Sequence, residues 1–427
     1  MKIKVMVLGG GGREHAIVHA FSKSDIVSEL HCCPGNPGIA QIAECHPGNP
    51  SNPGEIAALC KRLGIGLVFV GPEAPLVSGT ADALRDCGIL VMGPGKLGAQ
   101  LEGSKAFSKQ FMARHGIPTS SFSCCSDLIS CRNALEKRSA PYVVKADGLA
   151  AGKGAFILDT FDEAMDVCGR MLDDSILGEA GRTIVIEDFV AGQEMTVLAI
   201  TDGETVRILP SSQDHKRALD NDKGNNTGGM GAYSPVPWVD EKLTAKITDE
   251  ILIPTLEGLK KDGIPFCGVI YAGIMVKPDG ELSLLEYNVR LGDPETQVVL
   301  PVFDGDFGEV ILACCRGDLA KIKWPSAKQV ALGVVMASGG YPDKYATGIN
   351  IDFSCENIPG TYIYHAGTAL DADGNLVTSG GRVLTVVGIA DTLQEARDLA
   401  YKRVRSVSFR NAHYRNDIGD KSLKGAK

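Results

Sequence analysis

The sequence predicts a multidomain α/β and α+β protein. We expect an N-terminal parallel α/β domain at residues 1–103, a central domain of two antiparallel-sheet subdomains at 104–326, and a small mixed α+β domain at 327–427. The chain has 427 residues, more than one hydrophobic core usually supports. Buried-strand patterns alternate with helical segments in the first part, which indicates a parallel sheet. Strand pairs joined by turns and glycine-rich links in the central part indicate antiparallel sheets.

Composition narrows the class of protein. Hydrophobic residues make up 44% of the chain and charged residues 22%, as in an ordinary globular protein. The formal net charge is −9 and no basic run stands out, which argues against a nucleic-acid surface. The N-terminus enters a strand at once, and no apolar run is long enough to span a bilayer. We therefore expect a cytoplasmic protein that binds neither nucleic acid nor membrane.

Cysteine usage points to a reducing compartment. The thirteen cysteines are odd in number and include no Cys-x-x-Cys spacing. In a long chain without an export signal, this pattern predicts free thiols. We do not expect a structural or catalytic zinc site.

A glycine run follows the first predicted strand. Residues 3–8 form a buried-strand pattern, and Gly9, Gly10, Gly11 and Gly12 then lead into a helix. The N-terminus of a helix favours an anion, and dinucleotides, carboxylates and phosphate esters all use such a turn. Glu14 could contact a sugar or an amine, or it could simply occupy the first turn of the helix, where acids are favoured.

Two further polar residues lie beyond the ends of predicted strands. Asn36 stands in the turn at 34–38, and Glu73 follows the strand at 67–70. Ligands of wound parallel sheets bind outside the carboxyl ends of the strands, where these residues would lie. The alternative is that both belong to turns without a function.

The stretch at 141–154 predicts a flap over a phosphate chain. Tyr142 to Lys145 and Ala155 to Leu158 are strand patterns, and the link between them is rich in glycine. Glycines allow the backbone to approach a ligand closely, and a lysine adds positive charge. No Gly-Lys-Ser/Thr opens a helix here, so the link is not a Walker loop. A glycine-rich hairpin without a ligand is the alternative.

Two segments follow the flap. Residues 183–190 form a strand pattern that ends at a short linker before Glu194, which suits an adenine edge and a ribose. The stretch at 213–233 predicts a long polar loop, and loops of this length are usually functional or disordered. Its apolar residues Met230, Ala232 and Tyr233 argue against disorder.

Residues 266–276 and 281–290 predict a pair of strands. The period of two places Glu286, Asn288 and Arg290 on one face. The other face would carry Leu285, Tyr287 and Val289. Carboxylate and amide oxygens suit Mg²⁺, and the arginine fork suits an acyl or phosphoryl oxygen.

The region after residue 331 completes the expected fold. It should contain short strands at 332–336, 362–364 and 383–387 and a helix at 392–410.

Taken together, these stretches resemble the ATP-grasp enzymes, and within them the phosphoribosylamine–glycine ligase (glycinamide ribonucleotide synthetase) family of purine biosynthesis. The matching stretches span almost the whole chain: 7–16, 34–38, 71–76, 141–154, 213–217, 227–235, 286–295, 365–368 and 380–384. The resemblance implies an N-terminal pre-ATP-grasp domain, a flap subdomain at about 122–191, and an ATP-dependent ligation of glycine to 5-phosphoribosylamine through glycyl phosphate.

The resemblance also implies roles for individual residues. ATP would be bound by Lys105, Lys145, Gly148, Gly152, Lys153, Gly154, Glu187, Phe189, Val190 and Glu194. Mg²⁺ or Mn²⁺ would be bound by Glu286 and Asn288. Catalytic groups would be Arg290, Asp214, Lys216, Gly228 and Gly229. Phosphoribosylamine would be held by Gly10, Gly11, Gly12, Glu14, Asn36, Glu73 and Asp293. A monomer is expected.

Two departures from the family pattern stand out. Asn221 and Asn225 occupy positions where the family usually has glycine and proline, and the strand before Glu286 carries no second metal carboxylate. Three other interpretations remain open at this point. One is an ATP-grasp carboxylase or formyltransferase-type ligase, and another is a non-catalytic nucleotide sensor. A nicotinamide oxidoreductase is the third, although the spaced G-x-G-x-x-G is missing.

Overall fold

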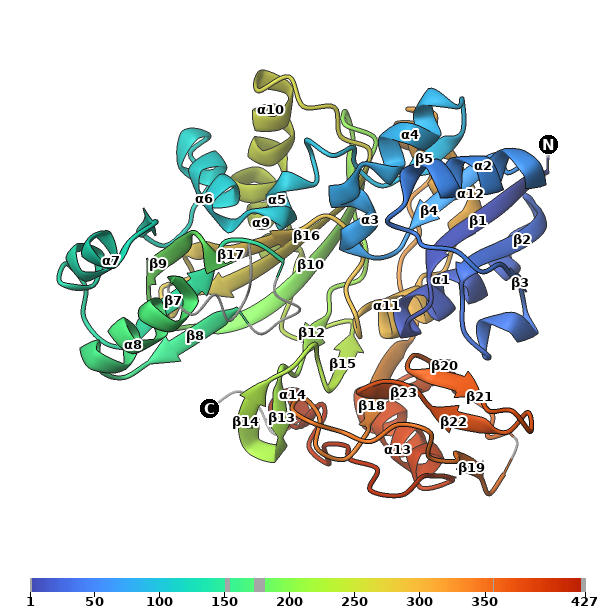
Figure 1. Ribbon diagram of the computed structural model, residues 1–427. Helices are drawn as coiled ribbons and strands as arrows, with labels where there is room; N and C mark the ends of the chain where they lie inside the picture. The colour runs from blue at the N-terminus through green and yellow to red at the C-terminus, as the bar shows by residue number, and fades with distance from the viewer. Residues whose placement is uncertain (1, 150–153, 173–180, 356, 424–427) are drawn as a thin grey trace.

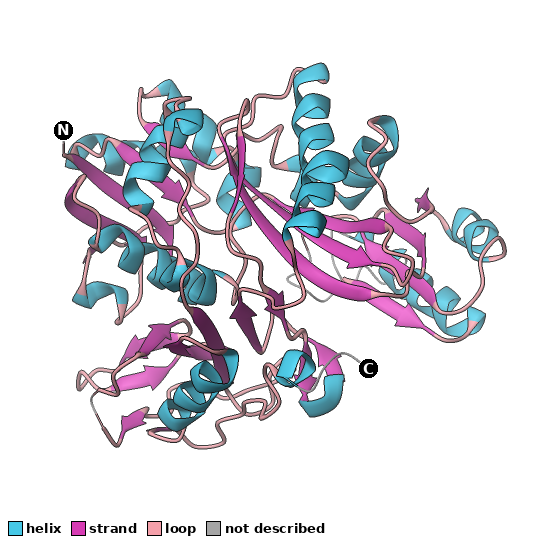
Figure 2. Cartoon of the chain, turned by 180° about the vertical axis from the view of Figure 1, so that it is seen from behind, coloured by secondary structure: helices cyan, strands magenta, loops and turns pink. Residues whose placement is uncertain are grey.

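A computed structural model of the chain describes residues 2–149, 154–172, 181–355 and 357–423. The N-terminal sheet lies at one side of the molecule and the two antiparallel sheets of the central part lie at the other (Figure 1, Figure 2). The C-terminal sheet lies beneath both (Figure 1). Among the described residues, no helix combines the length and the apolar character needed to cross a membrane.

The N-terminal sheet is parallel and has the order β3-β2-β1-β4-β5. Its strands are β1 (Ile3–Gly9), β2 (Val27–Pro34), β3 (Glu44–Cys45), β4 (Leu67–Val70) and β5 (Leu90–Met92). Residues of both strand faces are buried; Met6 and Leu8 belong to one core and Val5 and Val7 to another. This explains the continuous apolar runs in the sequence, because a parallel sheet is covered on both sides.

Helices from two distant parts of the chain accompany this sheet. The first set is α1 (Gly12–Ser22), α2 (Pro53–Leu63), α3 (Glu73–Ser78) and α4 (Thr80–Asp86), with a short 3₁₀ turn at Ile39–Gln41. The second set is α11 (Thr296–Val302) and α12 (Phe307–Cys315), with another 3₁₀ turn at Leu319–Lys321. α11 contacts α1, and α12 contacts β5. The segment after the central sheets therefore packs back onto the N-terminal sheet.

The central part contains two antiparallel sheets, as predicted. One has the order β6-β9-β7-β8, with β6 (Phe122–Cys125), β9 (Ile184–Asp188), β7 (Tyr142–Ala146) and β8 (Ala155–Leu158). The other has the order β11-β10-β16-β17, with β11 (Val206–Ile208), β10 (Gln193–Thr201), β16 (Gly268–Val276) and β17 (Leu282–Asn288). The accompanying helices are α5 (Gln100–Gly103), α6 (Lys105–Arg114), α7 (Leu128–Leu135), α8 (Phe161–Leu172), α9 (Glu241–Ile247) and α10 (Ile253–Lys261), with a π-helical turn at Thr248–Leu252.

The strand β17 contains a bulge that the simple alternation does not predict. Glu286 pairs with Gly273 and Leu284 pairs with Ile274, so Leu285 is the extra residue. The core face therefore carries Leu284 and Tyr287, and the expected placement of Leu285 on that face is wrong. Leu285 lines the cavity together with Glu286 instead.

The C-terminal sheet has the order β12-β15-β18-β23-β20. Its strands are β12 (Gln213–Asp214), β15 (Gly231–Ser234), β18 (Val330–Ala337), β23 (Arg382–Ala390) and β20 (Thr361–His365). The helix α13 (Leu393–Val404) contacts β18 and β23 and is shorter than the predicted 392–410. Smaller elements are the strand pairs β19 (Asp352–Phe353) with β24 (Val407–Ser408) and β21 (Thr368–Leu370) with β22 (Leu376–Thr378), and the helix α14 (Asp420–Leu423).

The stretch predicted as one long loop contains several strands. Its two ends, β12 and β15, join the C-terminal sheet, and between them β13 (Arg217–Leu219) pairs with β14 (Lys223–Asn226). The expectation of an unbroken loop at 213–233 is therefore wrong. Asn221 turns the β13–β14 hairpin with a φ of 59°, a left-handed conformation that asparagine tolerates better than most residues.

Candidate functional site

One large cavity lies among the three parts of the chain. Its volume is about 1740 Å³. Sites for a single drug-sized ligand usually measure roughly 300–1,000 Å³. The cavity therefore has room for a nucleotide together with smaller molecules. Residues from the N-terminal part, both central sheets and the C-terminal part line it, including Glu73, Lys145, Glu286 and Arg382.

A cluster of lysines occupies the end of the cavity near the two antiparallel sheets. Glu187 on β9 is buried, and its carboxylate contacts Lys145 Nζ at 2.9 Å and Lys109 Nζ at 2.8 Å. Burial raises the pKa of Glu187, but Lys145 and Lys109 outweigh it and lower that pKa to about 2. Burial lowers the pKa of Lys109 to about 8, against the attraction of Glu187. The Glu187 carboxylate is therefore ionised, because two lysines stabilise its negative charge.

Lys105 adds a third cation to this end. It opens α6, whose N-terminal cap is Ser104, and the backbone N–H of Lys105 donates to the carbonyl oxygen of Asp147 at 2.9 Å. This contact joins the start of α6 to the segment that follows β7. Lys105, Lys109, Lys145 and Glu187 are called the lysine cluster below. All four residues line the cavity, and Lys109 and Lys145 contact the Glu187 carboxylate. Three cations and one carboxylate suit a phosphate chain.

The flap and the linker were predicted to cover a nucleotide. Gly148 is half-buried, and Gly154 lines the cavity. Gly152 and Lys153 lie outside the described residues. Phe189 and Val190, in the linker after β9, line the cavity, and the ring of Phe189 is exposed. The linker thus offers backbone groups and an aromatic face at the mouth of the cavity.

Glu194, Asp214 and Lys216 form a second charged group. Lys216 Nζ is paired with Glu194 Oε1, and Asp214 lies close enough to interact with both. Burial lowers the pKa of Lys216, but Glu194 and Asp214 outweigh it and raise that pKa. Burial raises the pKa of Asp214, and the Lys216 charge only partly offsets this. Asp214 is therefore a carboxyl group that can exchange a proton near neutral pH.

Glu286 and Asn288 offer oxygens for a metal ion. Both residues lie on β17 and line the cavity. Burial raises the pKa of Glu286, but Lys216, Lys145, Lys105 and Arg290 together lower it, so the carboxylate is ionised. An ionised carboxylate and an amide oxygen in a cavity fit Mg²⁺, which keeps water and phosphate oxygens as further ligands.

Arg290 lies where β17 leaves the central sheet. Its Nη2 contacts Glu102 Oε1 at 2.9 Å, and its Nε lies 3.5 Å from Glu73 Oε2. Burial lowers the pKa of Arg290, but the charges of Glu102 and Glu73 outweigh burial and raise that pKa above its usual value. Glu102 is itself buried, and its other oxygen accepts the backbone N–H of Val289 at 2.8 Å. Glu102 therefore fixes both the backbone and the guanidinium at this point.

A hydroxyl-rich group lies beside Arg290. Tyr271 OH donates to Glu295 Oε1 at 3.0 Å, and Thr196 Oγ1 lies 3.0 Å from the same hydroxyl. The guanidinium carbon of Arg290 lies 5.9 Å from the centre of the Tyr271 ring. Tyr271 and Glu295 line the cavity and limit how Arg290 can move.

The glycine loop after β1 is held by its neighbours. A Cβ on Gly10 would lie 2.5 Å from the carbonyl oxygen of Gly35, so this close approach requires glycine. Glu14 accepts the N–H of Gly11 at 2.7 Å and the Nε–H of Arg13 at 2.5 Å. Its carboxylate is buried and occupied by these two contacts.

Asn36 joins two parts of the chain. Its amide group donates to the carbonyl oxygens of Gly10 at 2.9 Å and of His365 at 2.8 Å. Its carbonyl oxygen accepts the N–H groups of Gly38 and Ile39 at 2.9 Å each. Asn36 thus fastens the glycine loop to the C-terminal part, whereas Glu73 and Asp293 line the cavity directly.

Arg382 connects the C-terminal sheet to the cavity. It donates to the carbonyl oxygens of Gly228 at 2.7 Å and of Asp293 at 2.8 Å, and it contacts the Asp293 carboxylate at 2.9 Å. The N–H of Gly228 donates to Tyr341 OH at 3.1 Å and that of Gly229 to Thr227 Oγ1 at 2.9 Å. Both glycine N–H groups are therefore occupied in this structure.

Three arginines and four carboxylates meet where the three parts of the chain join. We call this group the arginine junction; its members are Arg13, Arg290, Arg382, Glu14, Glu73, Glu102 and Asp293. Burial raises the pKa of Asp293, but Arg382 and Arg13 lower it below its usual range. Glu73, Glu102 and Asp293 are held by arginines from other segments of the chain, whereas Glu14 is held by the neighbouring Arg13.

Sequence reasoning missed several residues of the site. Among them are Arg13, Glu102, Lys109, Tyr271 and Arg382. Lys109 could have been predicted from the sequence, because it lies one helical turn after Lys105 and therefore on the same face of the helix. Glu102 and Arg382 could not have been predicted, because their partners are far away in the sequence.

Comparison with known families accounts for most of the chain. The N domain of phosphoribosylglycinamide synthetase matches residues 3–102, the ATP-grasp (A) domain matches 103–296, and the C domain matches 331–421. The phosphoribosylamine–glycine ligase of Ralstonia nicotianae is 44% identical over 99% of this chain and 100% of its own length. The chloroplastic enzyme of that name from Arabidopsis thaliana is 42% identical over 96% of this chain and 79% of its own length.

Solved structures agree with these matches. The crystal structure of phosphoribosylamine–glycine ligase from Thermotoga maritima is 36% identical, with a TM-score of 0.86 over 98% of this chain and 100% of that one. The biotin carboxylase domain of the Hydrogenobacter thermophilus 2-oxoglutarate carboxylase has a TM-score of 0.75 over 97% of this chain and 92% of its own. Its sequence is only 16% identical, so this second likeness concerns the fold alone.

Proposed function

The chain belongs to the phosphoribosylglycinamide synthetase family, and we propose that it joins glycine to 5-phosphoribosylamine at the expense of ATP. The products would be glycinamide ribonucleotide, ADP and phosphate, as in purine biosynthesis. One observation carries this proposal above the others. Arg290 lies in a single cavity with the oxygens of Glu286 and Asn288, the lysine cluster, and residues of all three parts of the chain.

The reaction explains why these groups must share one cavity. A carboxylate does not react with an amine until one of its oxygens becomes a good leaving group. Transfer of a phosphoryl group from ATP to glycine achieves this and gives glycyl phosphate. The amine of phosphoribosylamine then attacks the carbonyl carbon, and phosphate leaves. Water has to be kept out, because the acyl phosphate would otherwise hydrolyse.

We assign ATP to the lysine-rich end. Lys105 and Lys145 would bind its phosphates, with the flap glycines Gly148 and Gly154 close by. The linker at 187–190 would contact the adenine through its backbone, since the Glu187 carboxylate is already paired with two lysines. Glu194 would take the ribose and would have to leave Lys216 to do so. Lys109 joins this set as a further cation.

Glu286 and Asn288 would hold Mg²⁺ or Mn²⁺. When bound, the ion offsets the negative charge that phosphoryl transfer develops. The Asn288 amide oxygen accepts a hydrogen bond from Arg290 Nη2 at 3.1 Å, so the metal residues and Arg290 are aligned with each other. The strand β16 brings no acid to this face, and Tyr271 and Met275 line the cavity there.

Arg290 would hold the glycine carboxylate and the transferring phosphoryl oxygens together. Its planar fork can contact two oxygens at once, and Glu102 fixes the direction of that fork. Substrate oxygens would have to replace the longer contacts that Arg290 makes with Asn288 and the Leu291 carbonyl oxygen. Asp214 and Lys216 would lie near the attacking amine, and Asp214 would accept the proton that it loses. The raised pKa of the buried Asp214 suits proton exchange near neutral pH. Gly228 and Gly229 are weaker candidates for stabilising the transition state, because their N–H groups already have hydrogen-bond acceptors.

The N-terminal part would bind phosphoribosylamine. Glu73 and Asp293 line the cavity and would face this substrate. Gly10, Gly11 and Gly12 would contact it through the backbone, with Glu14 and Asn36 fixing the shape of that loop. A monomeric state, a cytoplasmic location, the absence of nucleic-acid partners and the domain boundaries at residues 103 and 326 stay predictions.

Release of ADP tests the proposal. Turnover should require glycine and phosphoribosylamine together, and glycinamide ribonucleotide should accumulate in equal amount to ADP. Steady ADP release with bicarbonate or formate and no glycine would favour another ATP-grasp ligase instead. Absence of ADP release with every acceptor would make the chain a nucleotide sensor.

A further inference from the structure

Two histidines and a glutamate converge at the outer edge of the N-terminal sheet. His31 Nδ1 lies 3.0 Å from His46 Nε2. Glu44 places one oxygen 3.6 Å from His31 Nδ1 and the other 3.8 Å from His46 Nε2. His31 lies on β2, Glu44 lies on β3, and His46 directly follows β3; these two strands form the margin of the N-terminal part (Figure 1). None of the three residues lines the large cavity.

The backbone brings the three side chains to one face. The parallel pairing of β2 with β3 sets His31 beside Glu44, and the N–H of His46 donates to the carbonyl oxygen of Cys32 at 2.9 Å. Glu44 and His46 are two residues apart, so they project to the same side of an extended segment. Cys45 between them projects to the other side, where its sulfur packs against Gly35.

We propose that His31, Glu44 and His46 form a binding site for a divalent transition-metal ion, with Zn²⁺ as the best fit. Bonds of 2.0–2.1 Å in a tetrahedron require donor atoms about 3.3 Å apart. The two ring nitrogens are 3.0 Å apart, and each lies near this distance from a different oxygen of Glu44, at 3.6 Å for His31 and 3.8 Å for His46. A rotation of the exposed Glu44 side chain would direct one oxygen to both nitrogens. Two imidazoles and one carboxylate form a donor set that zinc accepts, with water completing the coordination.

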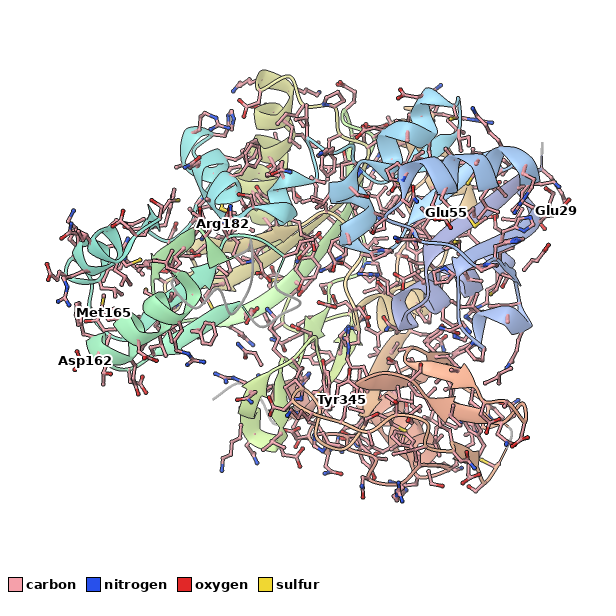
Figure 3. The ribbon with its side chains drawn as sticks, viewed as in Figure 1. Glu29, Glu55, Asp162, Met165, Arg182 and Tyr345 are labelled. Carbon is pink, nitrogen blue, oxygen red and sulfur yellow. The ribbon has the colours of Figure 1, made fainter. Side chains whose placement is uncertain are left out.

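The surroundings of His31 support this assignment. His31 is 3% exposed, and its Nε2 has no hydrogen-bond partner within the described residues. Glu29 Oε2 lies 3.5 Å from that nitrogen and is itself held by Lys4 at 2.7 Å. Figure 3 shows Glu29 at the outer margin of the N-terminal part. A metal-bound imidazole usually directs its second nitrogen to a carboxylate, and Glu29 stands in that position.

The 3.0 Å between the two ring nitrogens is also an ordinary hydrogen-bond distance. The competing account is a hydrogen bond between the two rings, which requires neither Glu44 nor Glu29.

The test is a titration of the full chain with Zn²⁺ in excess Mg²⁺, which fills oxygen sites in the large cavity. We expect one Zn²⁺ per chain and a rise in melting temperature, because the ion would join β2 to β3. His46→Gln should abolish this binding. Glu29→Gln should weaken it by roughly 10-fold, as expected for a residue that orients a ligand. His115→Gln should have no effect, since His115 directly follows α6 and its neighbours include the Asp262 carboxylate at 3.1 Å and the Phe111 ring.

Substitution with Co²⁺ identifies the donor atoms. The site should give the ligand-field absorption of a nitrogen and oxygen environment, without a thiolate charge-transfer band from any of the thirteen cysteines. This absorption does not depend on enzyme activity, so the metal site can be tested independently of the proposed reaction. Lack of stoichiometric binding, binding that survives His46→Gln, or a thiolate band would each overturn the proposal.

Discussion

The lysine cluster and the arginine junction are both groups of buried charge in the same cavity, yet they differ in balance. The lysine cluster contains three lysines and one carboxylate, that of Glu187, which Lys109 and Lys145 contact. The arginine junction pairs three arginines with four carboxylates. At one end of the cavity the lysines therefore outnumber the carboxylate, whereas at the other end each arginine is paired with a carboxylate of the protein.

This difference teaches how one cavity divides its work. An excess of cations attracts the phosphates of ATP and binds them more strongly once they arrive. A network in which every arginine already has a carboxylate partner adds little attraction for an anion, but it fixes the geometry of its members. Binding should therefore depend on the lysine cluster, and transfer of the phosphoryl group should depend on the arginine junction.

Arg290→Lys should give the largest effect. We expect kcat to fall by roughly 10²–10³-fold, because lysine keeps the charge but cannot form the two-oxygen fork in the transition state. ATP affinity should change little. Glu102 keeps a cationic neighbour, so the melting temperature should also change little. Steady-state kinetics, ATP titration and thermal unfolding measure the three quantities, with the exposed Arg316→Lys as a matched control.

Lys145→Met should produce the opposite pattern. We expect ATP affinity to fall by roughly 30–100-fold, as for the loss of one partner from a buried charge contact. The fall in kcat at saturating ATP should be smaller than the fall in affinity. The exposed Lys137→Met serves as the control in a calorimetric ATP titration. A large loss of kcat with normal ATP affinity would break the distinction between the two groups.

Glu102→Gln tests whether Glu102 acts through Arg290. We expect kcat to fall by about 10-fold with ATP affinity unchanged, because the guanidinium loses its fixed orientation. Unfolding free energy should also fall by about 1–3 kcal/mol, since a buried ion pair is broken. If Glu102 acts only through Arg290, adding Glu102→Gln to Arg290→Lys should lower kcat no further. Additive losses would show a separate role.

The pH dependence of stability should reveal the smallest effect. The pKa of Glu187 is about 2 in the folded chain, below the usual 4.5 of a glutamate. The unfolded chain therefore takes up this proton first as the pH falls. The stabilisation is complete above about pH 4.5 and is lost between pH 4.5 and about 2. Glu187→Gln should reduce the slope of unfolding free energy against pH in that window by at most one proton; an unchanged slope would contradict the pairing.

Local patterns predicted most of the fold. The parallel N-terminal sheet, the two antiparallel sheets and the flap strands β7 and β8 follow from periodicity and turn residues, which depend on near neighbours in the sequence. The strands β12 and β15 escaped prediction because they pair within the C-terminal sheet, where β15 lies beside β18. The bulge at Leu285 depends on the partner strand and cannot be recognised from the alternation of polar and apolar residues in β17.

The site was predictable only where its residues carry a local pattern. Glu286, Asn288 and Arg290 share a strand face, and Gly9 to Gly12 form a visible run. Glu102 and Arg382 become meaningful only when the fold places them beside Arg290 and Asp293. His31 and His46 illustrate the same limit, because a search for cysteine spacing could not find a cluster of histidine and glutamate.

The central claim is that the cavity activates glycine by transferring the terminal phosphoryl group of ATP to one of its carboxylate oxygens. Glycine labelled with ¹⁸O in its carboxylate tests this claim most directly when it is turned over with ATP and phosphoribosylamine. The bond between that oxygen and phosphorus persists when the amine displaces phosphate from the carbonyl carbon. Mass spectrometry of the released phosphate should therefore find one labelled oxygen per molecule. Phosphate without label, released together with ADP and glycinamide ribonucleotide, would contradict the account.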